Sequence, residues 1–240
     1  MTTPADLEQE AARFAALLSH VLNSSVCRGV ALDSLLITPD DQRDRERVLV
    51  ADGLADAPTP EPIPLSVAED PEERRRAPTW LTLEFRLMLD EEGRYLAVHS
   101  STMGLCIWPD TGRSVVRIEF DRDKRRHPAA HVHIEGASLE LGYAWGALGH
   151  SLPKRLADLH FPVGGLRYRP SLEDFVEFLI AEGLVGGFHD GWREALDESR
   201  EQYERIQLKA AVRHDPDAAY EALEAAGFLA DADEGRPRRS

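Results

Sequence analysis

The chain has 240 residues, of which 42% are hydrophobic and 30% charged, a composition typical of a folded globular protein with a substantial core. Its 28 Lys and Arg residues stand against 43 Asp and Glu residues, which gives a formal net charge of −15. This balance argues against a general surface for nucleic acid or anionic membranes, because phosphate affinity needs concentrated positive charge.

Cysteine usage and the N-terminal residues indicate where the protein works. Cys27 and Cys106 are too few and too far apart for a disulfide framework or a Cys-x-x-Cys zinc site. The first residues lack the basic and apolar regions of a signal peptide, and no apolar run has the length of a membrane span. We therefore expect a cytoplasmic protein with two reduced thiols and no membrane contact.

The first 78 residues predict a helix, a hairpin and an irregular arm. Apolar residues at three- and four-residue spacing predict an amphipathic helix over 4–22. Two short apolar runs, 35–37 and 48–50, flank a charged turn and predict a β-hairpin. Six prolines and a run of charges in 56–78 favour a linker, or an arm that wraps around the main domain.

Four strands are predicted next. Residues 80–101 alternate between apolar and polar on both sides of an acidic turn, which is typical of a hairpin. A third strand, 114–121, places Val116, Ile118 and Phe120 on one face and charged residues on the other, and a fourth covers 129–135. Short polar turns join these strands, so we expect an antiparallel meander of about four to six strands.

The second half of the chain predicts helices. Residues 137–148 suit a helix that two glycines weaken. Ser171 and Asp174 form a capping box in front of an apolar stripe, and Gly183 suits the left-handed end of that helix. A long helix is expected over 190–212, a last one after Asp215, and a disordered tail from 231. The predicted fold class is α+β, with the meander packed against helices from the N-terminus and the C-terminal half.

These elements divide the chain into five predicted regions. They are the N-terminal helix and hairpin over 1–55, the Pro-rich arm over 56–78, the main α+β domain over 79–185, C-terminal helices over 186–230, and the tail over 231–240.

The first candidate site is His131, His133 and Glu135, a tentative catalytic group. Residues i, i+2 and i+4 of a strand share a face, so both imidazoles and the carboxylate line up, while Val132 and Ile134 point to the core. Such side chains can act as general acid and base in phosphodiester cleavage, or bind a transition metal. A solvated sheet face explains the same alternation without chemistry, and we give that interpretation more weight.

Metal binding at His131 and His133 is the lesser alternative. The spacing reveals no third or fourth ligand, so we identify no cofactor and assign no metal site. His127, His150 and His160 are at most helpers whose places the sequence does not fix.

The second candidate is an anion-binding segment, 160–171, just before the capped helix. Gly164 and Gly165 permit a close backbone approach, and Arg167 and Arg169 share a face if the chain is extended there. Ser171 opens a helix N-terminus, which favours anions such as phosphate or carboxylate. The lysine and hydroxyl of a P-loop are absent, and a tight turn with its arginines paired to acids is the favoured interpretation.

Two segments resemble a known family. Residues 130–133, AHVH, and 159–174, LHFPVGGLRYRPSLED, resemble uncharacterised actinobacterial proteins that carry LHFPVGG-x-R-[FY]-RP-x-LED, and 80–105 resembles their hairpin. No activity is known for that family, so the resemblance implies none. The sheet ending in a His-Pro…His-x-His strand is also similar to small toxin components of bacterial toxin–antitoxin pairs.

No common catalytic motif is present in the sequence, so a non-enzymatic role is favoured over an enzymatic one. Three functional hypotheses are compatible with these observations. The first is a bacterial protein that works through a protein partner or a homo-oligomer, as a component of a toxin–antitoxin or defence-type module. The second is a nuclease or other hydrolase that uses His131 and His133, with Arg167 and Arg169 holding phosphate. The third is a small-ligand or metal-binding module. Convergence of those four side chains in one pocket would favour the hydrolase, and a solvated histidine face would favour the binding protein.

Overall fold

A computed structural model of the chain describes residues 6–37, 45–54, 59–107, 114–124, 126, 128–136, 161–163 and 169–228. Contacts divide the chain into two compact units, Met1–Leu196 and Asp197–Ser240. The predicted helix over 137–148 and the tail from 231 lie outside the described residues.

Helix α1 (Leu7–Ser25) begins the first unit, and a local signal fixes its start. The side chain of Asp6 accepts hydrogen bonds from the backbone N–H groups of Glu8 and Gln9, which no residue inside the helix can satisfy. Its apolar stripe, which includes Ala11, Leu18 and Leu22, is buried in the core. The predicted N-terminal helix is confirmed, with both ends three residues later than expected.

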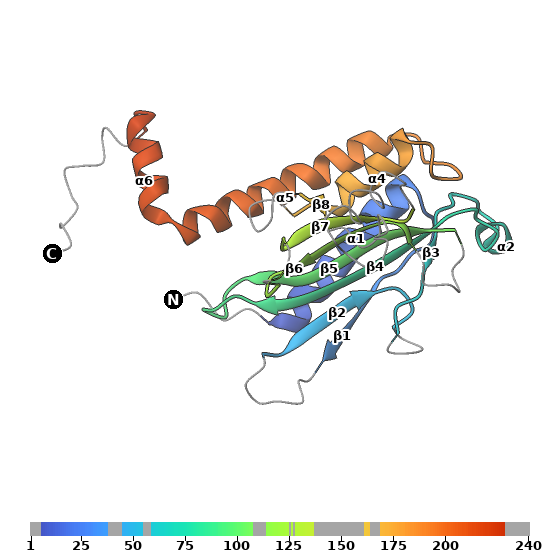
Figure 1. The fold of residues 1–240 in the computed structure, drawn as a ribbon, viewed down its shortest axis with the longest axis horizontal. Helices are drawn as coiled ribbons and strands as arrows, with labels where there is room; N and C mark the ends of the chain where they lie inside the picture. Colours follow the sequence, from blue (N-terminus) through green and yellow to red (C-terminus); the bar gives the residue numbers. More distant parts are fainter. Residues whose placement is uncertain are drawn as a thin grey trace, which may run out of the picture. The chain divides into compact units, whose positions relative to one another are not determined.

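An eight-stranded antiparallel sheet forms the centre of the first unit (Figure 1). Its strands are β1 (Asp33–Ile37), β2 (Arg47–Ala51), β3 (Ile63–Pro64), β4 (Trp80–Leu89), β5 (Leu96–Cys106), β6 (Ser114–Asp121), β7 (Ala130–Ile134) and β8 (Phe161–Pro162). They run in the order β1-β2-β4-β5-β6-β7-β8, with β3 paired to β4. The predicted α+β class with an antiparallel meander is confirmed.

The sheet reaches further toward the N-terminus than the predicted regions suggest. The N-terminal hairpin joins the main sheet because β2 pairs with β4, and the Pro-rich stretch contains β3 and a short helix, α2 (Pro71–Arg74). The boundaries predicted after residues 55 and 78 therefore fall inside one compact unit.

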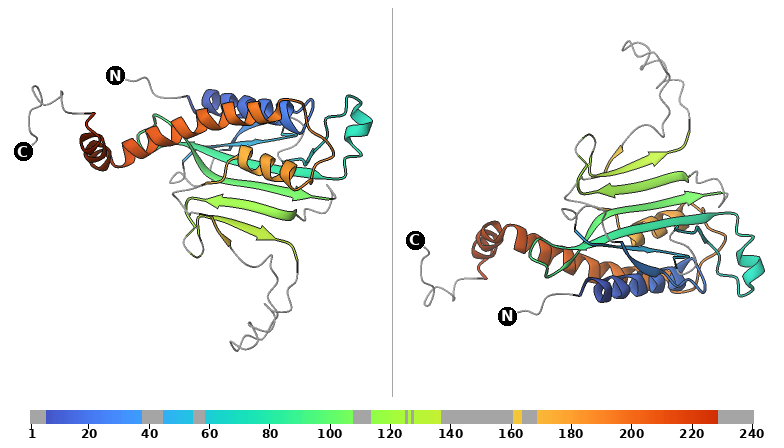
Figure 2. Two further views of the ribbon diagram at one scale, coloured as in Figure 1. Left: turned by 90° about the horizontal axis from the view of Figure 1, so that it is seen from above. Right: turned by 90° about the horizontal axis from the view of Figure 1, so that it is seen from below.

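The two faces of the sheet differ. On the face that we call the helix face, Phe85 meets Phe14 of α1 edge-on with ring centroids 5.2 Å apart. Helix α4 (Leu172–Ala181) lies on that face as well and adds Phe175 and Leu179 to the core (Figure 2). Each fully buried Leu or Phe of this core contributes about 1.5–3 kcal/mol. Alternation places Glu84 and its cross-strand partner Thr102 on the opposite, polar face.

Two more helices follow, and the division between the units falls within the first of them. Helix α5 (Trp192–His214) begins in the first unit, and the second unit holds its remainder together with α6 (Pro216–Ala225). Asp215 caps α6 and Pro216 occupies its first turn, as the sequence predicts, but no residue of α6 is buried. Among the described residues, no helix combines the length and apolar character that a membrane span requires.

Candidate functional site

Strands β6 and β7 bring the site together through their pairing register. His131 lies opposite Glu119 and His133 opposite Arg117, and all four residues are on the polar face. The apolar residues of β6, which include Ile118 and Phe120, occupy the helix face, and this fixes the direction of the charged side chains between them.

The histidine side of β7 is its buried side. His131 is 0% exposed and His133 8% exposed, whereas Val132 is half-buried and Ile134 is 41% exposed. This is the reverse of the expectation that Val132 and Ile134 would face the core while the histidines met solvent. A solvated sheet face therefore does not explain the His-x-His alternation in this strand.

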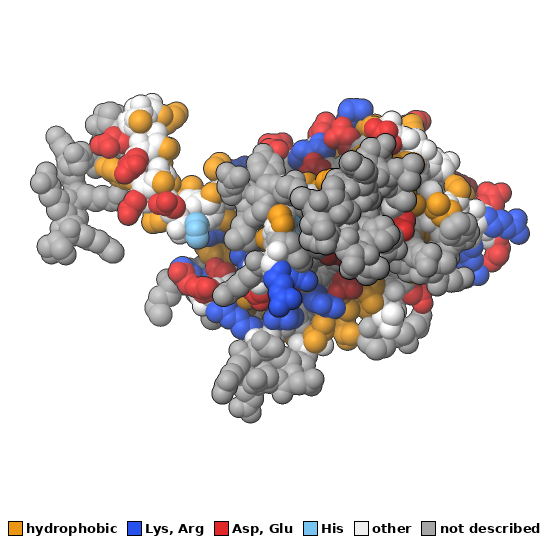
Figure 3. Space-filling view, in the orientation of Figure 1, with side chains coloured by type: hydrophobic (Ala, Val, Ile, Leu, Met, Phe, Trp, Pro, Cys, Tyr) orange, Lys and Arg blue, Asp and Glu red, His pale blue; other side chains and the backbone are white. Residues whose placement is uncertain are grey.

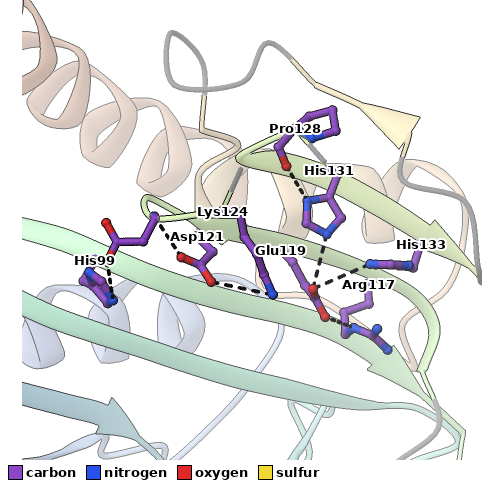
Figure 4. A network of polar contacts seen from close by, with 9 residues as sticks. His99, Arg117, Glu119, Asp121, Lys124, Pro128, His131 and His133 are labelled. Atoms are coloured by element: carbon purple, nitrogen blue, oxygen red, sulfur yellow. Dashed lines mark hydrogen bonds and ion pairs between the residues drawn. The ribbon is translucent and has the colours of Figure 1, made fainter. Parts of the chain in front are cut away.

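Glu119 connects the two histidines (Figure 4). Its Oε2 atom lies 3.3 Å from Nε2 of His131 and 3.6 Å from Nε2 of His133. The two imidazole rings are nearly perpendicular, with centroids 4.9 Å apart and an interplanar angle of 74°. Ligand atoms of all three residues lie within 4.8 Å of one another, close enough to hold one metal ion.

A backbone carbonyl orients the first histidine. Nδ1 of His131 donates a hydrogen bond of 2.9 Å to the carbonyl oxygen of Pro128, since a carbonyl can only accept. This bond directs Nε2 toward Glu119, and in the neutral imidazole it leaves the lone pair on Nε2. Histidines that bind metals are typically held by such a bond through their other nitrogen.

Arg117 binds the second oxygen of the Glu119 carboxylate. Its Nε lies 2.6 Å from Oε1 of Glu119, so the two carboxylate oxygens face different partners. Burial by itself raises the pKa of Glu119, but the hydrogen bond and charge of Arg117, together with His133 and His131, outweigh burial and lower it. Glu119 is therefore an anion at neutral pH.

Glu135, the predicted third member of the histidine group, takes a different place. Strand β7 ends at Ile134, and the backbone N–H of Glu135 donates to the carbonyl of Val115 at 2.8 Å. The acid that meets both histidines is Glu119 of the neighbouring strand. The alternation of β6 does mark Glu119 and Arg117 as polar-face residues, but their meeting with β7 depends on a register that the sequence does not give.

The predicted anion-binding segment is only partly described. Gly164, Gly165 and Arg167 lie outside the described residues. Ser171 caps α4, and its hydroxyl accepts a 3.2 Å hydrogen bond from the backbone N–H of Asp174. The guanidinium carbon of Arg169 lies 5.7 Å from the ring centroid of Phe85.

Arg169 and the histidines consequently lie on opposite faces of the sheet. Phe85 belongs to the helix face, where it meets Phe14, whereas Glu84 next to it is on the same face as Thr102, Glu119 and His131. The hydrolase hypothesis in its original form requires Arg169 to lie beside the histidines. The described structure does not bring these residues together.

Comparison with known proteins adds no further assignment. No protein-family model, no curated protein and no solved structure matches this chain. The resemblance to the actinobacterial family therefore stays a prediction.

Proposed function

We propose that this protein binds one divalent transition-metal ion through Glu119, His131 and His133, and that this centre is its functional site. The observation that carries the proposal is the meeting of three ligand atoms from two adjacent strands. A tetrahedral ion with bonds of about 2.0–2.2 Å to nitrogen and oxygen separates its ligand atoms by roughly 3.4 Å. The separations of 3.3 and 3.6 Å between Glu119 and the histidines agree with that spacing.

The electrostatics of the cluster support a cation among these atoms. With its Nδ1 proton bound to Pro128, a neutral His131 directs a lone pair at an ionised carboxylate, which is repulsive. A metal ion bound to both atoms would remove this repulsion, as would a second proton on His131 or a bridging water molecule. A charge-assisted N–H···O bond typically spans about 2.7–2.9 Å, which is shorter than the 3.3 and 3.6 Å between Glu119 and the two histidines.

The donor set resembles that of catalytic metal centres. Two imidazoles and a carboxylate suit zinc or iron, and three protein ligands leave room for water or substrate, whereas structural zinc sites have four protein ligands. A bound ion would polarise a substrate oxygen or lower the pKa of a bound water molecule. The proposal therefore retains the hydrolase hypothesis in a metal-dependent form.

The experiment is a titration of the purified, chelator-treated protein with Zn²⁺ and Co²⁺, followed by elemental analysis and thermal melting. We expect one equivalent to bind, and a stabilisation of about 2.7 kcal/mol at a free metal concentration one hundred times Kd. Glu119→Gln should weaken metal binding at least tenfold, because it removes the only charged ligand of the three.

Glu84→Gln is the matched control. Glu84 lies on the same face, has the same 29% side-chain exposure as Glu119, and pairs with an arginine two residues along its strand at 2.9 Å. The Glu84→Gln variant should bind metal with the same affinity as the unchanged protein. Absence of metal binding in the unchanged protein, or equal loss in both variants, would contradict the proposal.

Exposed apolar residues favour a second candidate, a partner-binding role of the toxin–antitoxin or defence type. Several large apolar side chains of the second unit are at least 40% exposed, and apolar atoms are visible on the surface around α6 (Figure 3). On α5 they are Ile206, Leu208 and Val212, on α6 Tyr220 and Leu223, and Phe228 follows α6. The buried free thiols Cys27 and Cys106 support the cytoplasmic location proposed with it.

This candidate is tested with the protein as bait in a lysate of its source cell. A stoichiometric partner should be retained by the unchanged chain and lost by the double variant Leu223→Ser, Phe228→Ser. Equal retention by both baits would show that the apolar surface is not involved.

A further inference from the structure

The proposed metal centre leaves at least one coordination position to be filled, and what fills it depends on the charges around it. A divalent ion and Arg117 bring three positive charges against the single negative charge of Glu119. Four described charges on the polar face are already paired, because Arg86 binds Glu84 at 2.9 Å and Lys124 lies 3.8 Å from Asp121. The charges of the ion, Arg117 and Glu119 together are therefore net positive.

Arg117 has hydrogen-bonding capacity to spare. Its Nε is used by Glu119, but its two terminal nitrogens, which carry four N–H groups, make no hydrogen bond to any described residue. The side chain is 34% exposed, so a small molecule can reach it. A guanidinium fork is the group best suited to bind two oxygens of a carboxylate or phosphate at once.

The position of Arg117 suits a ligand that also touches the metal. Arg117 is opposite His133 in the strand register, and its guanidinium lies beside the Glu119 carboxylate and near the His133 ring (Figure 4). An oxyanion with one oxygen on the ion could direct another oxygen to the guanidinium.

We infer that the exogenous ligand of this centre is a small oxyanion, a carboxylate or phosphate group, recognised by the free terminal nitrogens of Arg117. This inference rests on the proposed metal centre. The overall charge of −15 disfavours a long polyanion such as nucleic acid and favours a small molecule.

The test uses the full chain loaded with Co²⁺, whose visible absorption reports on its ligands. Inorganic phosphate and acetate are titrated separately at constant ionic strength. We expect at least one of them to change the spectrum in a saturable manner, and the one that binds identifies a phosphate or a carboxylate ligand. Arg117→Gln should weaken that binding at least tenfold, with Arg86→Gln as the matched control that binds as the unchanged protein does.

The affinity for Co²⁺ gives a second readout. Loss of an arginine with a merely structural role would weaken Co²⁺ binding together with anion binding. Arg117→Gln should bind Co²⁺ at least as tightly as the unchanged protein, because a competing positive charge has gone. Arg117→Lys keeps the charge without the fork and should have an intermediate anion affinity, so it replaces Arg117→Gln if that variant does not fold.

Two results would overturn the inference: a cobalt spectrum that neither anion changes, or equal anion affinity in the Arg117 variants and the unchanged protein. Failure of the metal centre itself would be seen earlier, as absence of Co²⁺ binding before any anion is added.

Discussion

Asp52, which follows β2, illustrates how a single carboxyl group can oppose the fold. Burial raises the pKa of Asp52, and the nearby carboxylates of Asp33 and Glu61 raise it further, against a hydrogen bond from the backbone of Gly53. A carboxyl group with a raised pKa favours folding when protonated. That contribution is fully present below the pKa of the unfolded chain and is lost as the pH rises through the pKa of the folded protein.

Asp52→Asn should therefore raise the free energy of unfolding at pH 7. Asparagine keeps the shape and the acceptor oxygen but carries no charge, so the repulsion from Asp33 and Glu61 disappears. The gain should shrink toward zero as the pH falls below 3.8, the ordinary pKa of an aspartate. Urea denaturation at several pH values measures it, and the exposed Glu91→Gln serves as a control that should show no such trend.

The residues of the proposed metal centre also show what a single position contributes. Glu119, His131 and His133 each fit an ordinary strand pattern, and no one of them is unusual. They form a cluster because the carboxylate of one strand lies beside both imidazoles of the next.

At the scale of the element, helix α4 is held at its start by a reciprocal pair of hydrogen bonds. The Ser171 hydroxyl accepts from the N–H of Asp174 at 3.2 Å, and the Asp174 carboxylate accepts from the N–H of Ser171 at 3.0 Å. Ser171 is only 3% exposed, so water cannot easily replace its hydroxyl.

Ser171→Ala should destabilise the protein by about 1 kcal/mol, because an orphaned N–H at the helix start loses its acceptor. Ser24→Ala is the control, because Ser24 lies within α1, where alanine is the better helix former and a small gain is expected. Chemical denaturation compares the two variants. Equal effects would show that the capping hydroxyl of Ser171 contributes nothing beyond helix propensity.

At the scale of the whole molecule, the two compact units differ in what they bury. The described core residues belong to the first unit, whereas α6 has no buried residue. We therefore expect the sheet with α1 and α4 to supply the cooperative unfolding transition.

A chain that ends at residue 214 should have a melting temperature within about 2 °C of that of the full chain. Removing an element with no buried residue should lower the free energy of unfolding by less than about 1 kcal/mol, which shifts the melting temperature of a protein of this size by no more than a few degrees. Differential scanning calorimetry of the two chains measures the change. A fall of more than about 5 °C in the melting temperature would show that the first unit depends on α6 for its stability.

The sequence by itself determined most of the elements. The period of 3.6 residues in α1, the alternation in β4 and β6, and the capping signal at Ser171 are local patterns, because backbone geometry alone fixes which side chains share a face. The same locality explains why His131 and His133 could be recognised as one side of one strand.

Only the tertiary structure decided what those side chains meet. The register of β6 against β7 placed Glu119, twelve residues before His131, at the histidines, and left Glu135 outside the cluster. The tertiary structure also buried the histidine side of β7 and placed Arg169 on the helix face, away from the histidines. Register and burial depend on packing between segments distant in the sequence, and a shift of one residue would reverse both faces of a strand. His131 and His133 are therefore visible in the sequence as candidates, whereas Glu119 and the proposed ligand set emerge only from the folded sheet.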